Sequence, residues 1–152
     1  MYKAVIFDFF GVFCPDLSLE WFKTVPSYQA KLADFQAICT KSDYDKISRE
    51  DFYKEVAVLA NVPAAQAAQE IEANTAIDTE LVQYVRSLRG KHYKTACLSN
   101  GTNEWTLRII TNYGLADLFD EIVLSGDIGI VKPNAGIYNE TLRRLGVRPE
   151  EA

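Results

Sequence analysis

Several kinds of residue are scarce in this chain of 152 residues. It has one histidine, His92, and three cysteines, none of which forms a Cys-x-x-Cys pair. This excludes zinc-finger and disulfide-scaffold classes and suits the reducing cytoplasm. No apolar run approaches the roughly 18 residues that a membrane span requires, and no signal-peptide pattern opens the chain. We therefore expect a cytoplasmic protein that has no membrane partner, and we expect His92 to be solvent-exposed in a polar turn.

Basic residues are also fewer than acidic residues. The chain has 16 lysines and arginines against 21 aspartates and glutamates, which gives a net charge of −5 at pH 7. This balance argues against nucleic acid as a partner. The composition is otherwise that of a folded protein, with 48% hydrophobic and 12% aromatic residues. The length fits one domain, or one domain with an insertion.

Three short apolar runs each end on polar residues. Residues 3–7 precede Asp8, residues 93–98 precede Ser99-Asn100-Gly101, and residues 122–124 precede Ser125-Gly126-Asp127. Apolar runs of this length that are bounded by turn signals are typical of strands buried in a parallel sheet. Because ligands bind beyond the carboxyl ends of such strands, we expect these polar residues to surround a site.

Helical patterns fill the segments between the runs. Residues 17–77 are expected to be wholly helical, with Ser48 capping one helix, and Asp78 caps a further helix that ends at Gly90. Further helices are expected over 103–112 and 134–145. The alternation predicts an α/β fold with a parallel sheet and helices on both of its faces. Since the block after the first strand is too long for one crossover, we expect a core domain of residues 1–14 and 78–152 and a helical cap domain of residues 15–77.

Three segments then match motifs of a known family. The segments are Phe7-Asp8-Phe9-Phe10-Gly11-Val12, Leu98-Ser99-Asn100-Gly101 and Lys132-Pro133. In this order they resemble the first three motifs of the haloacid dehalogenase-like hydrolase superfamily. The helical insertion resembles the cap of its subgroup of 2-haloacid dehalogenases and phosphoglycolate phosphatases. The resemblance implies a Rossmann-like core.

The resemblance also implies roles for individual residues. Asp8 would be the nucleophile, and Lys132 would offset charge between nucleophile and phosphate. Ser99, with the backbone amides near Asn100 and Gly101, would bind the phosphate. Asp8 and the backbone carbonyl of Phe10 would be ligands of Mg²⁺. The function implied is a magnesium-dependent phosphatase that hydrolyses a small phosphorylated metabolite through an aspartyl-phosphate intermediate.

Phe10 departs from the phosphatase pattern. The family's phosphatases usually have a second aspartate there, which acts as general acid, and losing such a group lowers the rate by about 10²–10⁴-fold. Good leaving groups such as acyl phosphates would suffer least. An aromatic residue at this position, together with Tyr138, also resembles the metal-free 2-haloacid dehalogenases. Those enzymes hold the halide with a cap arginine, but no arginine lies between Cys14 and Ile47 and Arg49 lies at a helix start. Dehalogenation is therefore the third hypothesis.

The family's fourth motif is the second departure. It is an acidic pair, one strand further on, that completes the magnesium site, and this sequence ends at Pro149-Glu150-Glu151-Ala152. Asp127 is a candidate substitute. We expect either that the chain is a fragment of a longer protein or that it self-associates through the exposed edge of its first strand. The alternative function is that of a catalytically inactive binding or interaction protein with the same fold.

Overall fold

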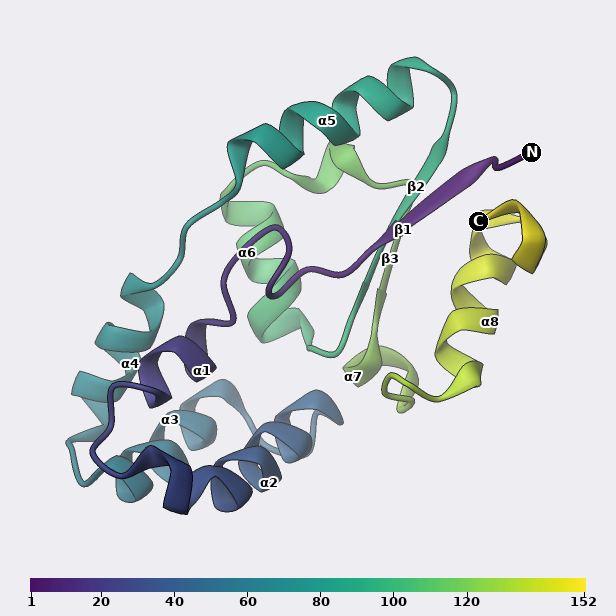
Figure 1. Ribbon diagram of the computed structural model, residues 1–152. Helices are drawn as coiled ribbons and strands as arrows, with labels where there is room; N and C mark the ends of the chain where they lie inside the picture. The colour runs from purple at the N-terminus through teal and green to yellow at the C-terminus, as the bar shows by residue number, and fades with distance from the viewer.

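Three parallel strands form the sheet at the centre of the molecule (Figure 1). They are β1 (Ala4–Phe7), β2 (Lys94–Ser99) and β3 (Glu121–Leu124), in the order β1-β2-β3. The structure is a computed structural model and describes residues 1–152. In the register of the sheet, Phe7 pairs with Cys97 and Ser99 pairs with Leu124. The carboxyl ends of all three strands therefore meet at one edge, which confirms the predicted parallel sheet.

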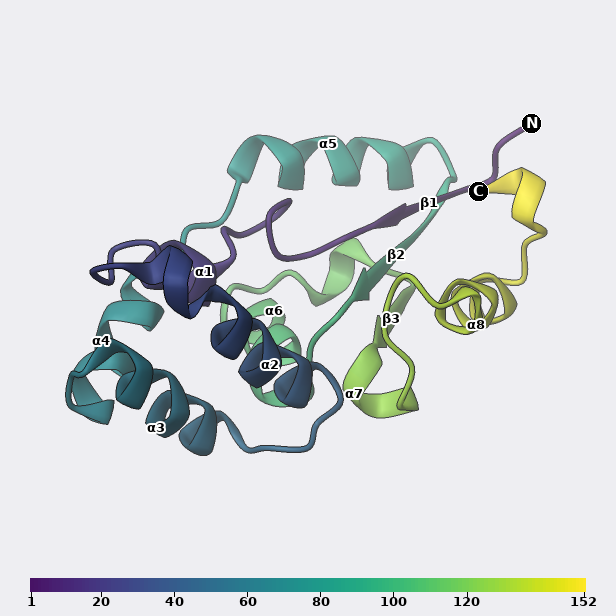
Figure 2. The same ribbon diagram turned by 60° about the horizontal axis from the view of Figure 1, so that its bottom comes forward.

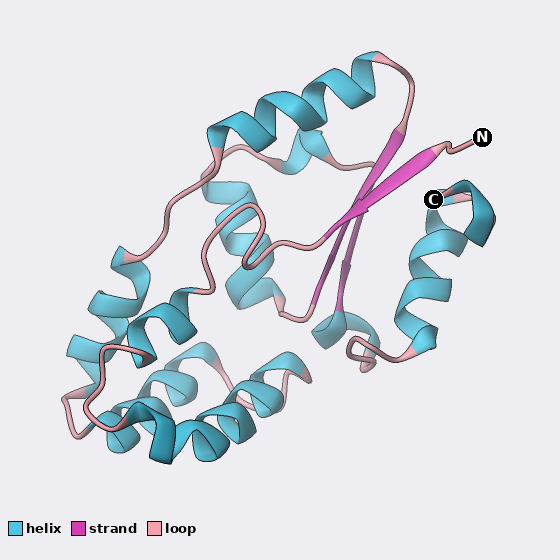
Figure 3. Ribbon diagram, viewed as in Figure 1, coloured by secondary structure: helices cyan, strands magenta, loops and turns pink.

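Helices cover both faces of the sheet, as expected (Figure 3). Cys97 on β2 packs in the cluster that includes residues of α5 (Thr79–Gly90) and α6 (Arg108–Asn112). The neighbouring side chains of β2 point the other way, where they pack against α8 (Ala135–Leu145). Because successive side chains of a strand alternate between faces, a central strand covered on both sides is buried along most of its length. Five of the six residues of β2 are buried.

Side-chain caps begin the helices where the sequence predicts them. The Asp78 carboxylate accepts a hydrogen bond from the Leu81 N–H at 2.8 Å, and Ser48 Oγ accepts one from the Asp51 N–H at 3.1 Å. Asn134 caps α8 in the same way. Each bond satisfies a backbone donor that the first helical turn leaves without a partner, so local sequence alone fixes these boundaries.

The helical cap lies beyond the carboxyl ends of the strands (Figures 1 and 2). Its elements are α1 (Leu17–Phe22), the short η1 (Tyr28–Lys31), α2 (Leu32–Asp43), α3 (Arg49–Ala60) and α4 (Ala64–Ala73). Phe22 stacks on Phe35 with ring centroids 4.1 Å apart. The largest buried cluster runs without interruption from these helices to the sheet. The domain boundaries 1–14, 15–77 and 78–152 stay a prediction.

Short elements complete the chain. The helix expected over 103–112 begins as a wider π-helical turn, η2 (Asn103–Leu107), and continues as α6. The others are η3 (Ala116–Leu118), α7 (Ser125–Ile128) and η4 (Pro149–Glu151).

The two termini lie side by side, where the Lys3 N–H donates to the Glu151 carbonyl at 2.7 Å. No helix combines the length and apolar character needed to cross a membrane. Self-association through β1, an edge strand, stays a prediction.

Candidate active site

A cavity of about 300 Å³ lies between the carboxyl edge of the sheet and the cap helices. Its lining includes all six residues that the family motifs single out: Asp8, Phe10, Ser99, Asn100, Gly101 and Lys132. It also includes eight residues that the sequence did not single out: Asp16, Leu17, Ser18, Cys39, Ser42, Asp43, Phe52 and Trp105. The parallel register brings the first set together, because each motif follows a strand or a loop at the same edge.

Asp8 and Lys132 form an ion pair at the floor of this cavity. Lys132 Nζ lies 2.7 Å from Asp8 Oδ1 and also donates to the Leu98 carbonyl at 3.0 Å. Asp8 Oδ1 accepts a further hydrogen bond from the Phe9 N–H at 2.8 Å. Asp8 Oδ2 has no partner in the chain, and the side chain is 44% exposed against 18% for Lys132. The carboxylate is therefore oriented through one oxygen while the other is open to a ligand.

Asn100 holds the backbone of Lys132 in place. Its Oδ1 accepts from the Lys132 N–H at 2.8 Å, and its Nδ2 donates to the Lys132 carbonyl at 3.3 Å. The motif resemblance points only to the backbone of Asn100, so this use of its side chain is a feature that sequence reasoning missed. It joins the loop after β2 to the loop that carries the lysine.

The donors at the end of β2 differ in their availability. The Gly101 N–H donates to Ser125 Oγ at 2.9 Å, so this amide is already used inside the protein. The nearest acceptor to the hydroxyl of Ser99 is the Asn100 carbonyl at 3.4 Å, which leaves that hydroxyl weakly held. The backbone N–H groups of Phe10 and Asn100 have no acceptor within the chain. Of the amides that were expected to bind phosphate, that of Asn100 is free and that of Gly101 is not.

The cap supplies two further carboxylates, Asp16 and Asp43. Asp16 caps α1, where it accepts from the Leu19 N–H at 3.1 Å and from the Ser18 hydroxyl at 3.1 Å. Asp43 ends α2 and is half-buried. Burial raises the pKa of Asp43 to about 6; the charge of Asp16 adds to this rise and that of Lys132 opposes it. No motif marks either residue, because their place beside the cavity depends on how the cap helices pack.

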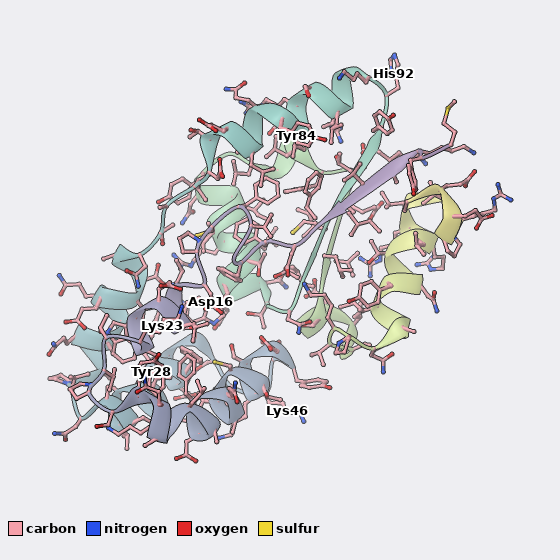
Figure 4. All side chains as sticks on the ribbon, viewed as in Figure 1. Asp16, Lys23, Tyr28, Lys46, Tyr84 and His92 are labelled. Carbon is pink, nitrogen blue, oxygen red and sulfur yellow. The ribbon has the colours of Figure 1, made fainter.

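His92, Cys39 and Asp127 are not placed to take part in the chemistry. His92 is exposed at the far end of α5, as expected (Figure 4). Cys39 lines the cavity, but burial raises the pKa of its thiol to about 12, so it is not a reactive thiolate at neutral pH. Asp127 does not line the cavity, and its carboxylate accepts from Asn103 Nδ2 at 3.0 Å.

The cavity offers the oxygen ligands that a magnesium ion prefers, but it offers few of them. The Asp8 carboxylate and the Phe10 carbonyl oxygen, which accepts no hydrogen bond in the chain, are hard oxygen donors. No three acidic, histidine or cysteine side chains lie close enough together to hold a metal. Mg²⁺ prefers six oxygens and commonly keeps several waters beside one or two carboxylates and substrate phosphate. Two protein oxygens are compatible with that pattern.

A comparison with family models gives the family. The model for haloacid dehalogenase-like hydrolases matches residues 2–152. The chain belongs to this hydrolase family. Its fold agrees: a haloacid dehalogenase-family enzyme of Bacteroides thetaiotaomicron, solved with magnesium and inorganic phosphate, has a TM-score of 0.74 at 21% identity, over 99% of this chain and 82% of that one.

Curated relatives of this haloacid dehalogenase-like hydrolase include phosphatases and a dehalogenase. A glyceraldehyde 3-phosphate phosphatase of Methanothermobacter thermautotrophicus is 37% identical over 65 residues, which is 43% of this chain and 29% of that protein. The (S)-2-haloacid dehalogenase 1 of a Pseudomonas species is 34% identical over 65 residues, again 43% of this chain and 29% of the relative. The matches thus span under a third of the length of these relatives.

Proposed function

We propose that this haloacid dehalogenase-like hydrolase removes phosphate from a small phosphorylated metabolite, with Asp8 as nucleophile. One observation carries the proposal: the open oxygen of Asp8, the ammonium of Lys132 and the hydroxyl of Ser99 line one cavity. Phosphoryl transfer depends mainly on positioning and on neutralising charge, and these three groups provide both. The phosphatases among the relatives support the same reaction class.

The chemistry follows from the positions of these groups. Asp8 Oδ2 forms a bond to phosphorus while the bond from phosphorus to the leaving oxygen breaks. The leaving oxygen keeps the electron pair of that bond and takes a proton from water, and a second water then hydrolyses the aspartyl phosphate. Lys132 fixes Asp8 through Oδ1 and offsets negative charge. The Ser99 hydroxyl and the free N–H groups of Phe10 and Asn100 donate to phosphate oxygens. Mg²⁺ held by Asp8 and the Phe10 carbonyl would neutralise further phosphate charge.

Substitution of the nucleophile tests the proposal. We expect Asp8→Asn to lower the hydrolysis of an aryl phosphate in the presence of magnesium by at least about 10³-fold, since the amide cannot form the covalent intermediate. Asp127→Asn is the matched control, because Asp127 is a carboxylate outside the cavity whose oxygen an asparagine retains. Phosphate release is the measurement. Equal rates for the native protein and Asp8→Asn would instead favour a catalytically inactive binding protein.

The dehalogenase relative makes carbon–halogen cleavage the other reaction to consider. Lys132 is the only basic residue that lines the cavity. Arg49 of the cap lies 3.3 Å from Glu72 instead, and is not part of the lining. The cavity therefore lacks the cap arginine expected to hold a halide, and this favours phosphate over a haloacid. Chloride release from a 2-haloacid without metal would overturn that preference.

A further inference from the structure

The cap side of the cavity carries negative charge and no positive charge. Asp16 and Asp43 both line it. The cap has six basic residues, none of which lines the cavity: Lys23, Lys31, Lys41, Lys46, Arg49 and Lys54. Five of these bind acidic side chains or a carbonyl elsewhere, and Lys46 lies over the ring of Tyr44 at 5.0 Å. In Figure 4, Asp16 lies at the start of α1 and Lys46 lies beyond the end of α2. Lys23 lies nearer to Asp16, but it pairs with Glu20 at 2.7 Å.

The charges in the cavity do not balance around a phosphate ester. Asp8 and Lys132 form a pair at 2.7 Å and cancel one another. Asp16 and Asp43 remain, and a phosphate monoester brings further negative charge. Mg²⁺ at Asp8 would offset the phosphate, but it would add no cation to the cap side of the cavity, where both of these carboxylates lie. An acidic group at the other end of the substrate would be repelled there, and a neutral group would leave both carboxylates unpaired.

The rest of the lining suits a cation. Phe10, Phe52 and Trp105 provide aromatic surface, with the rings of Phe52 and Trp105 in edge contact at 5.3 Å. Aromatic rings beside carboxylates are the surroundings in which proteins bind ammonium groups. Ser42 also lines the cavity; the residue is 8% exposed, and its hydroxyl makes no hydrogen bond within the chain. Its hydroxyl is therefore free to bond a ligand in the cavity.

We infer that the metabolite carries a protonated amine on its leaving group, as in a phosphorylated amino alcohol or amino sugar. This inference rests on the phosphatase function proposed above. Asp43 is the main partner of the ammonium, with Asp16 and the Ser42 hydroxyl accepting further N–H donors. The hydroxyl of Ser125 donates to the Asp43 backbone carbonyl at 2.6 Å, which fixes the end of α2 beside β3. Asp43 is therefore held over the edge of the sheet where the phosphate would lie.

The state of Asp43 agrees with this assignment. Burial, with the charge of Asp16, raises the pKa of Asp43 to about 6, and Lys132 is the one cation that opposes the rise. Three other charged residues lie at this end of α2, and none of them pairs with Asp43: Lys41 binds Glu55 at 2.8 Å, Asp45 is exposed, and Lys46 lies over the ring of Tyr44. The carboxylate thus forms no ion pair in the free protein, and an ammonium group would supply a paired cation.

Three phosphate esters of similar size test the inference: phosphoethanolamine, 2-hydroxyethyl phosphate and phosphoglycolate. We expect kcat/KM to be at least about tenfold higher for the amine than for the alcohol, and lowest for the acid. Asp43→Asn should remove the advantage of the amine, so that kcat/KM becomes similar for the amine and the alcohol. Asp45→Asn is the matched control, since Asp45 lies outside the cavity and an asparagine tolerates its positive φ of 55°.

The outcomes separate the inference from the function on which it rests. If Asp8-dependent hydrolysis of an aryl phosphate is present and the amine has no advantage over the alcohol, the amine inference is wrong and the phosphatase stands. If no ester is hydrolysed, calorimetry on the folded Asp8→Asn protein decides. Tighter binding of phosphoethanolamine than of 2-hydroxyethyl phosphate, lost in Asp8→Asn combined with Asp43→Asn, supports the inference. Equal affinities overturn it.

Discussion

The partly buried position of Asp43 beside the cavity lowers the stability of the folded protein at neutral pH. A carboxyl whose pKa is about 6 in the folded protein has an ordinary value near 3.8. The folded state therefore binds its proton more tightly than the unfolded state does. It follows that this group favours folding most at low pH, and that its contribution is lost as the pH rises through about 4 to 6.

We therefore predict that Asp43→Asn stabilises the protein at pH 7.5. The gain should be on the order of 1–2 kcal/mol, since a pKa change of one unit corresponds to about 1.4 kcal/mol and solvent screens part of it. The gain should vanish at pH 4, where Asp43 itself is largely protonated. Urea unfolding at the two pH values, followed by circular dichroism, measures it. The exposed Asp45→Asn should show no such pH-dependent gain, and an equal gain in both variants would contradict the assignment.

Only some of the residues that line the cavity could be predicted from the sequence. Asp8, Ser99 and Lys132 could be found because each belongs to a short motif at a strand end. Asp16 and Asp43 lie in the cap, where their neighbours are set by helix packing over long distances in the sequence. The hydrogen bond from the Gly101 N–H to Ser125 Oγ could not be predicted for the same reason, since it joins the ends of two strands.

At the scale of elements, the turn from β2 into η2 depends on glycine. A Cβ on Gly101 would lie 2.3 Å from Thr106 Oγ1 and 3.6 Å from Ser99 Oγ. Thr106 is fully buried in the π-helical turn, so its side chain has little room to move away. The chain after the strand thus packs against its own next turn, at the point where the Ser99 hydroxyl and the Asn100 amide face the cavity.

Gly101→Ala should therefore disturb the candidate phosphate site. We expect a loss of stability of about 1–3 kcal/mol, typical of overpacking, and a fall in phosphatase activity of at least tenfold. Gly90→Ala is the control, because a Cβ there meets no atom within 4 Å. Thermal unfolding and aryl phosphate hydrolysis measure the two effects. Native-like stability and activity in Gly101→Ala would show that the turn can accommodate the added methyl group and that neither property depends on its close packing.

The elements themselves were largely predictable, for local reasons. Ser48, Asp78 and Asn134 cap helices through bonds to residues two or three positions away, and apolar runs mark the buried strands. The π-helical start at Asn103 was not predictable. It places Trp105 against Phe52 and Tyr53 of the cap, at 5.3 and 5.4 Å, in a contact between distant segments of the sequence. Tertiary contacts of this kind decide local geometry that propensities cannot.

At the scale of the whole molecule, the position of the cap depends on a junction beside the cavity. Glu72 of α4 accepts two hydrogen bonds from Arg108 Nη2, each 2.7 Å, and others from Arg49 and from the Tyr53 hydroxyl. Burial opposes the charge of Glu72, but the bonds from Arg108 and Tyr53 outweigh it and hold the pKa of Glu72 below its ordinary value. The ion pair thus joins cap to core and keeps Glu72 ionised.

We predict that Arg108→Met loosens this junction. The free energy of unfolding should fall by about 1–3 kcal/mol at pH 7, because a charged hydrogen-bonding partner of a half-buried carboxylate is lost. KM should rise more than kcat falls, since the substitution displaces the cap wall that carries Asp43 and leaves Asp8 and Lys132 in place. Because a lowered carboxyl pKa stabilises only above it, the difference in stability should shrink as the pH falls below 4.5.

Arg143→Met provides the comparison that makes this prediction specific. Arg143 also pairs with a glutamate at 2.7 Å, but on the outer surface of α8, where its side chain is 71% exposed. Exposed pairs contribute at most about 1 kcal/mol, so this variant should resemble the native protein in both unfolding and kinetics. If Arg108→Met behaved like Arg143→Met, the ion pair between Arg108 and Glu72 would not determine the position of the cap. The aromatic contacts of Trp105 with Phe52 and Tyr53 would then be the part of the junction that sets the shape of the cavity.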